Sequence, residues 1–245
     1  MTTKMTTKLV ERKRILVFSS KLSLQRRSAS SIWQFDGTFD TAPDIFTQIL
    51  TVHGEYRHES FPFVYALLPD KTEDSYRRVI AAVLQACDDY GIDHPAPTTS
   101  ISDFEKGIIN AVLAELEDVD IRLCLFHLRQ SAFRKILVLG LQPAFRDPED
   151  DTVRKGFRTI VGTAFVPTDV QAFIQARGTL PRSMDGFADY FEQTCVMSRR
   201  PRGNRRPPPP RYPPHQWNQY IAARELLPRT NNATEAWHNR FQVRE

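Results

Sequence analysis

Cysteine is scarce in this chain: there are only three in 245 residues, and they follow no regular spacing. An odd, scattered set argues against a disulfide framework and suits a reducing compartment. A long apolar run is also missing near the start, where the longest apolar stretch is residues 15–18. That stretch is too short for a signal peptide or a membrane span. We therefore expect a soluble intracellular protein with no membrane partner.

A large excess of one charge is missing as well, because 33 basic and 29 acidic residues leave a formal net charge of +4. This excess is too small to establish nucleic-acid binding, so the placement of the basic residues matters more than their number. The chain does have an apolar fraction of 41%. Together with its length, that fraction allows one large domain, or one domain with an insertion.

The first half of the chain has strand patterns first and then alternates them with helical ones. A short strand is expected at 15–18, and a meander around a polar hairpin loop at 53–59 is expected from strands at 32–39, 46–52 and 61–68. Helices at 73–90, at 105–116 and up to about 139 then alternate with strands at 98–102 and 121–126. This order predicts an α/β fold: a ribonuclease-H-like mixed five-stranded sheet flanked by helices.

The pattern of the sequence changes after residue 141. Residues 142–198 show helical patterning without a strand signal, which predicts an α-helical insertion. Residues 199–214 are rich in arginine and proline, cannot form a regular helix, and are expected to be a linker. That linker is either simply solvated or a strap that contacts phosphates through Arg199, Arg200, Arg202, Arg205 and Arg206. The remaining expected parts are a disordered tail at 1–14, a core at 15–141 and a terminal helix region at 215–245 that completes the core.

Three acidic residues stand in settings that suit metal binding, namely Asp36, Asp103 and Glu235. Two of them end predicted strands, and the third lies on a predicted late helix. Such a set can hold paired divalent metals, which cut and join phosphodiesters. The prediction therefore depends on whether the three carboxylates meet in space.

Each of these acids also has a purely structural explanation. Asp36 with the glycine after it fits a type I′ hairpin turn. Ser102 and Glu105 fit a Ser-x-x-Glu capping box, which leaves Asp103 free as the first helical residue at the carboxyl end of a strand. Glu235 fits a helix cap begun by Asn232, although it faces away from the apolar stripe of its own helix.

A series of short motifs runs through the chain in a fixed order. They are Asp36-Gly37-Thr38-Phe39, Ala42-Pro43, Phe61-Pro62-Phe63-Val64-Tyr65, Ser102-Asp103-Phe104-Glu105, Cys124-Leu125-Phe126-His127, and Pro228-Arg229-Thr230-Asn231-Asn232 with Glu235 and Trp237-His238. Together they resemble the transposase domain of Mutator-like elements (MULEs), over about residues 15–241. The resemblance implies a ribonuclease-H-like Asp-Asp-Glu catalytic core that cleaves DNA and transfers strands with two Mg²⁺ or Mn²⁺ ions.

Carried over by motif, the catalytic and metal-binding triad is Asp36, Asp103 and Glu235, with the helical insertion before the last catalytic helix. Cys124 and His127 match the family's Cys-x-x-His signature beside the triad, and His238 follows Glu235 closely. A structural zinc site needs four ligands, and no second close pair accompanies Cys124 and His127, so zinc is not expected. We expect Cys124 to pack as a small apolar residue and His127 to hydrogen-bond near the site.

The resemblance implies double-stranded DNA as partner, at transposon ends and target, together with a homo-oligomer when active and a nuclear location. Arg229 and the linker arginines would grip the DNA backbone. Family members commonly carry an upstream zinc-binding recognition module, which this sequence lacks, and ten residues follow Glu235. We therefore expect a partial or decayed transposase copy. Two alternatives stay open: a non-catalytic DNA-binding or regulatory protein derived from a transposase, and another nuclease on the same fold.

Overall fold

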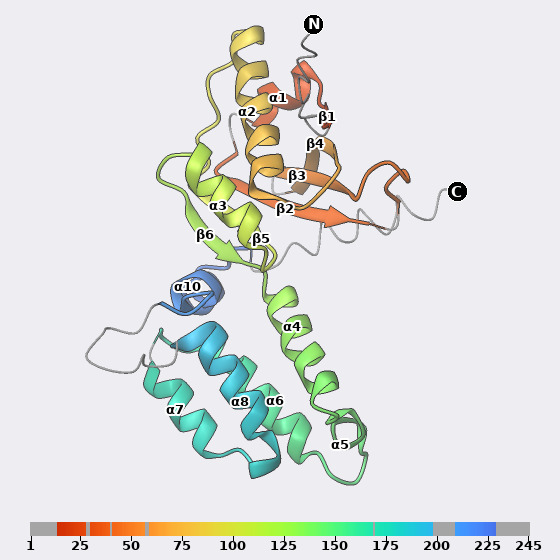
Figure 1. The fold of residues 1–245 in the computed structure, drawn as a ribbon. Coiled ribbons are helices and arrows are strands. Elements are labelled where there is room, and N and C mark those ends of the chain that lie inside the picture. Colours follow the sequence, from red (N-terminus) through yellow and green to blue (C-terminus); the bar gives the residue numbers. More distant parts are fainter. Residues whose placement is uncertain are drawn as a thin grey trace, which may run out of the picture.

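The computed structural model describes residues 14–27, 30–39, 41–56, 59–168, 170–197 and 209–228. A six-stranded sheet with its helices forms the upper part of the view in Figure 1, and a group of helices forms the lower part. In chain order the strands are β1 (Leu16–Phe18), β2 (Ile32–Thr38), β3 (Gln48–Tyr56), β4 (Glu59–Leu68), β5 (Thr99–Ser102) and β6 (Asp120–Leu123). The helices associated with the sheet are α1 (Lys21–Arg27), α2 (Glu73–Tyr90) and α3 (Lys106–Glu115).

The strand order across the sheet is β1-β4-β3-β2-β5-β6. Strands β2, β3 and β4 form an antiparallel meander, whereas β5 runs parallel to β2, and β6 runs parallel to β5. This arrangement confirms the predicted mixed α/β sheet of ribonuclease-H-like order. The sheet has six strands rather than five because β1 pairs antiparallel with the outer edge of β4.

The two faces of the sheet differ in polarity because neighbouring residues of a strand point to opposite faces. One face is apolar: Phe35 lies opposite Val52, and both belong to the main core with residues of α2 and α3. On the other face Asp36 lies opposite Thr51, with the pair Gln34 and His53 next to it. These four polar residues are buried. The catalytic candidate Asp36 is thus part of a buried polar row rather than of the apolar core.

Helix α2 has the boundaries that its sequence predicts. The hydroxyl of Thr72 accepts a hydrogen bond from the backbone N–H of Ser75 at the first turn. Gly91 ends the helix in the left-handed region, with φ of 63°. The apolar spacing predicts a buried stripe of Tyr76, Val79, Ile80, Val83, Leu84 and Cys87. All of these residues are buried except Leu84, which is partly exposed. This stripe fixes α2 on the apolar face of the sheet.

The structure corrects two predicted boundaries. Residues 53–56 and Glu59, predicted as part of a polar loop, belong to strands instead: β3 continues to Tyr56 and pairs with β4 from Glu59 onward, because cross-strand pairing outweighs the polar sequence here. The rest of the predicted loop lies outside the described residues. Residues 121–126 are not one strand, since β6 ends at Leu123 and α4 (Leu125–Val138) begins directly after Cys124. A short apolar run does not by itself distinguish strand from helix.

The lower part of the molecule is helical. After α4 come α5 (Gln142–Arg146), α6 (Thr152–Gly162), η1 (Thr163–Phe165), α7 (Val170–Gly178), η2 (Arg182–Met184), α8 (Asp185–Phe191), η3 (Glu192–Val196), α9 (Pro214–Trp217) and α10 (Tyr220–Arg224). Aromatic rings connect these helices in a continuous series through Phe133, Phe145, Phe157, Phe187, Phe191 and Trp217, with ring centroids 5.1–6.5 Å apart. The division of the chain into core, insertion, linker and terminal region stays a prediction.

In the part of the chain that the structure describes, no helix combines the length and the apolar character needed to cross a membrane.

Candidate active site

Asp36 lies inside β2, where it is 6% exposed. Its backbone carbonyl accepts a hydrogen bond from the Thr51 hydroxyl at 3.3 Å. The residue after it, Gly37, is also in the strand, and a Cβ there would come within 2.7 Å of Gln48 Oε1. The Asp36-Gly37 pair is therefore extended strand rather than a hairpin turn, and the glycine allows Gln48 to approach closely.

Asp103 follows the carboxyl end of β5 and comes level with Asp36. In the parallel pair of β2 and β5, Gln34 lies opposite Ile101, so two further residues along each strand bring Asp36 and Asp103 side by side. The electrostatics agree: burial, then the negative charges of Glu105 and Asp36, raise the pKa of the Asp103 carboxyl to about 7. The positive charge of Lys71 opposes this shift. Two of the three predicted acids thus lie together.

The Asp103 carboxylate lacks a full set of hydrogen bonds. Its Oδ1 is shut off from solvent and has no hydrogen-bond partner among the described residues. A buried carboxylate oxygen in this state costs free energy unless a cation or a proton reaches it. Asp36 and Asp103 therefore offer carboxylate oxygens as hard metal ligands. Their negative charges repel each other, and a bound cation would offset that repulsion.

Glu105 has a structural role that differs from the predicted capping box. Helix α3 begins at Lys106, and Glu105 precedes it without a side-chain cap. Its carboxylate instead accepts a hydrogen bond from the Tyr76 hydroxyl and lies 3.6 Å from the Lys71 Nζ. The Tyr76 hydroxyl in turn accepts from Gln48 Nε2 at 2.7 Å.

The capping-box prediction was therefore wrong, because the tyrosine and the lysine hold the Glu105 carboxylate away from the helix start. Ser102 does not cap the helix either, since its hydroxyl donates to the Asp103 carbonyl at 3.2 Å. Asp103 belongs to the loop before α3 rather than to the first helical turn.

Cys124 and His127 stand at the start of α4, next to the two acids. Cys124 is fully buried, and its backbone N–H donates to the Ser102 carbonyl at 2.8 Å, which ties α4 to the end of β5. Burial lowers the pKa of the His127 imidazole, while the charge of Asp36 opposes the shift and that of Arg134 adds to it. His127 is thus within the electrostatic reach of Asp36 and stays neutral near pH 7.

The other predicted site residues lie outside the described residues, namely Glu235, His238, Arg199, Arg200, Arg202, Arg205, Arg206 and Arg229. Within the described ranges, no three or more His, Cys, Asp or Glu residues are grouped so that they could hold a metal ion. The catalytic role of the triad and its completion by Glu235 stay predictions.

Sequence reasoning missed three residues near Asp103. Lys71 forms an ion pair with Glu105 and also stands 3.8 Å from the centroid of the Phe39 ring. Tyr212 packs on Phe104, the residue after Asp103, with ring centroids 4.8 Å apart. Lys106 lies on Tyr212, with its Nζ 5.3 Å from the ring centroid. The contact between Phe104 and Tyr212 joins residues 108 positions apart, so no local pattern indicates it.

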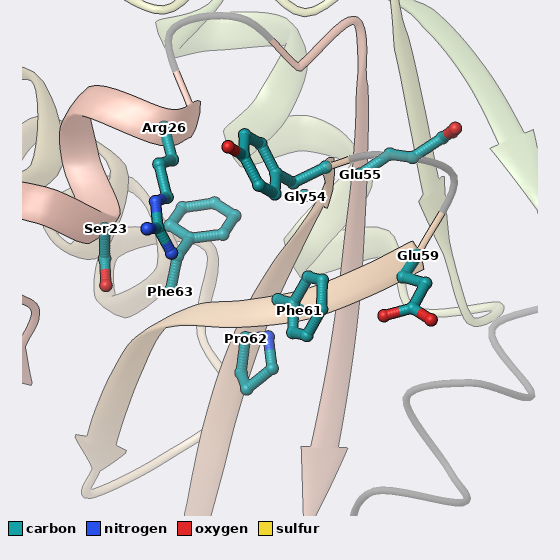
Figure 2. A pocket seen from close by; sticks show the side chains of 9 residues that line it. Ser23, Arg26, Gly54, Glu55, Glu59, Phe61, Pro62 and Phe63 are labelled. Carbon is teal, nitrogen blue, oxygen red and sulfur yellow. The ribbon is translucent and has the colours of Figure 1, made fainter.

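A separate cavity of about 540 Å³ opens near the other end of β2, where Gly54 lies opposite Trp33. Figure 2 shows Arg26 of α1 together with Phe61 and Phe63 of β4 among the residues that line it. The Arg26 guanidinium lies 5.2 Å from the centroid of the Tyr56 ring. Neither Asp36 nor Asp103 lines this cavity, so it is not part of the acidic site.

Comparison with protein families matches residues 32–131 to the MULE transposase domain, a range that contains Asp36, Asp103, Cys124 and His127. Among solved structures, the catalytic core domain of HTLV-2 integrase in complex with magnesium, in a trimeric form, is similar with 14% sequence identity and a TM-score of 0.24. That alignment covers 58% of this chain and 89% of the integrase chain. Comparison with curated proteins found no match.

Proposed function

We propose that the chain is the catalytic domain of a DNA transposase, because residues 32–131 match the MULE transposase domain. The proposed reaction is divalent-metal-dependent cleavage of double-stranded DNA at transposon ends, followed by strand transfer into target DNA. A nuclear location and a homo-oligomer that holds two DNA ends belong to the same proposal.

The observation that carries the proposal is the pairing of Asp36 and Asp103. The register of β2 and β5 brings both carboxylates to one place, and their mutual repulsion contributes to the raised pKa of Asp103. Structural ion pairs normally remove such repulsion, whereas here Lys71, whose charge acts on Asp103, forms its ion pair with Glu105. Carboxyl groups whose pKa is perturbed by burial and by a neighbouring charge cluster at functional sites.

These residues fit a pair of Mg²⁺ or Mn²⁺ ions, which favour carboxylate oxygens and retain several waters. Asp36 and Asp103 would hold them, and Glu235 would supply the third carboxylate. When bound, two such ions activate the attacking oxygen and stabilise the leaving oxygen of an in-line displacement. The buried Oδ1 of Asp103 is the oxygen with most to gain from a cation, since it makes no other hydrogen bond to a described residue.

Other side chains near the two acids would assist the proposed reaction. In cleavage a water oxygen attacks phosphorus and the DNA 3′-oxygen leaves. In strand transfer that 3′-hydroxyl oxygen attacks a target phosphorus, and the target strand's 3′-oxygen leaves. His127, neutral and near Asp36, is placed to hydrogen-bond a phosphate oxygen without adding charge. Glu105 is held by Tyr76 and Lys71, and so it orients the Asp103 loop rather than taking part in the reaction.

The test is nicking of a supercoiled plasmid in the presence of Mn²⁺. Asp103→Asn keeps the side-chain volume and removes the charge, so we expect nicking to fall by at least about 10²-fold, the scale seen when one electrostatic group at a reacting centre is lost. The matched control is Asp93→Asn, an exposed aspartate in the loop after α2, which should leave nicking unchanged.

Equal nicking by the wild type and by Asp103→Asn would rule out this acid as a catalytic residue. A wild-type protein that binds DNA but never nicks it, and that gives no heat on Mn²⁺ titration, would instead support the regulatory alternative.

A further inference from the structure

The end of the arginine- and proline-rich stretch, described from residue 209 onward, packs against the Asp103 loop. The Tyr212 ring meets the Phe104 ring edge to face, at an interplanar angle of 76°, and its hydroxyl donates a hydrogen bond to the Phe104 carbonyl. The Tyr212 backbone is held in turn, because its N–H donates to the Thr194 carbonyl and its carbonyl accepts from Trp217 Nε1. Tyr212 is therefore held rigidly against Phe104, the residue that follows the predicted metal ligand Asp103.

Two cations lie on the Tyr212 ring. Lys106 Nζ lies 5.3 Å and the Arg211 guanidinium carbon 5.5 Å from the centroid of the Tyr212 ring. An aromatic face attracts each of them. However, the two like charges repel one another: burial, and then the charge of Arg211, lower the pKa of Lys106.

Within the described part of the chain, neither cation has a carboxylate partner. Among the described residues, no aspartate or glutamate forms an ion pair with Lys106 or Arg211. The nearest acid in sequence, Glu105, is taken up by Lys71 and Tyr76. Cations on the surface of a protein commonly face solvent, but a pair gathered on one buried ring beside an acidic site is unusual. An anion bound between them would relieve their repulsion.

The proposed function supplies an anion of the right kind. We propose that Lys106 and Arg211, held on Tyr212, form a clamp for a backbone phosphate of the DNA strand that enters the Asp36–Asp103 site. The proposal rests on the transposase function, and it adds the residues that position the strand. A lysine ammonium and an arginine guanidinium both bind phosphate oxygens through charge-assisted hydrogen bonds. The acids repel the phosphates of DNA, so a cationic contact next to them is needed to hold the strand in place until metal binds.

The clamp can be tested apart from catalysis by measuring DNA binding in EDTA. The probe is a fluorescein-labelled 20-base-pair duplex, and the measurement is anisotropy at several salt concentrations. Each phosphate contact contributes about 0.9 to the slope of log affinity against log salt. Because both residues hold the same phosphate, we expect Lys106→Gln and Arg211→Gln each to lower that slope by up to about 0.9. At that limit, the affinity of the variant relative to the wild type falls about eightfold for each tenfold decrease in salt concentration.

Arg26→Gln is the matched control. Arg26 also lies on a tyrosine ring, but in the separate cavity of Figure 2, so its loss should leave slope and affinity unchanged. Far-ultraviolet circular dichroism and thermal melting of all variants will separate lost contacts from lost folding. Slopes for Lys106→Gln and Arg211→Gln equal to that of Arg26→Gln would overturn the clamp.

The two proposals fail separately. If Asp103→Asn abolishes nicking while both clamp variants bind like the wild type, the transposase function stands and the clamp is wrong. If the clamp variants show a smaller slope of log affinity against log salt while the wild type never nicks DNA, the clamp stands and the catalytic function is wrong.

Discussion

Asp103 and Glu105 are two residues apart and both carry a carboxylate, but their surroundings give them different roles. Glu105 has a hydroxyl donor and a lysine, and both partners come from or precede α2. Asp103 has neither, and its Oδ1 is buried without a hydrogen bond to a described residue. The first carboxylate therefore stabilises the fold, whereas the second destabilises the metal-free protein and is left available for a ligand.

That difference predicts how stability depends on pH when metal is absent. Since the pKa of Asp103 is raised from 3.8 to about 7 in the folded protein, the folded state binds more protons than the unfolded state between these values. Stability should therefore fall as pH rises from about 4 to 7. Asp103→Asn removes the effect, so in EDTA it should match the wild type near pH 4 and exceed it near pH 8.

The size of the gain is limited by water at the partly exposed Asp103 side chain. The full shift would be worth about 4 kcal/mol, and solvent screening should reduce it to roughly 1–2 kcal/mol. Urea unfolding of both proteins across this pH range gives the measurement. If the wild type became more stable relative to Asp103→Asn toward pH 8, the environment assigned to Asp103 would be wrong.

Among the elements, helix α2 shows what a sequence predicts well. Its apolar spacing and its closing glycine are local, and the structure confirms both. The predicted end of the strand before residue 53 and the predicted strand at 121–126 were wrong, because strand ends depend on pairing with distant segments rather than on local pattern. The same reason explains why the motifs indicated Asp36 and Asp103, whereas nothing near residue 104 indicated that Tyr212 packs on Phe104.

The closing glycine of α2 gives a prediction at this scale. Gly91 has φ of 63° with open space around its Cα, so Gly91→Ala should cost about 1 kcal/mol of unfolding free energy from backbone strain alone. Gly162 also has open space, but its φ of −63° is helical. Gly162→Ala should therefore stabilise the protein by about 0.5–1 kcal/mol.

Chemical denaturation of these two variants separates conformation from crowding, because neither alanine would meet a neighbouring atom. If both variants changed the unfolding free energy equally and in the same direction, backbone conformation would not determine the effect of alanine. The left-handed conformation assigned to Gly91 at the end of α2 would then be wrong.

Over the whole molecule, residues 209–228 join the sheet to the helical part. Buried Gln219 connects both: its Nε2 donates to the Leu123 carbonyl at the end of β6, at 3.1 Å, and its backbone N–H donates to the Ala164 carbonyl of η1, at 2.7 Å. Tyr212 belongs to the same segment. The acidic site at the sheet and the cations beside it therefore depend on how firmly this segment is held.

Gln219→Ala tests that dependence. It leaves the buried Leu123 carbonyl without its side-chain donor, which should cost about 1–3 kcal/mol. Because Cys124 starts α4 directly after Leu123, hydrogen exchange should accelerate across β6 and the first turn of α4 as well as in η1. Asn218→Ala is the control, since the exposed Asn218 side chain contacts the Val166 carbonyl within the helical part, and its loss should accelerate exchange only near η1 and α10. Identical exchange patterns for the two variants would mean that Gln219 does not couple the helical part to the strands that carry the site.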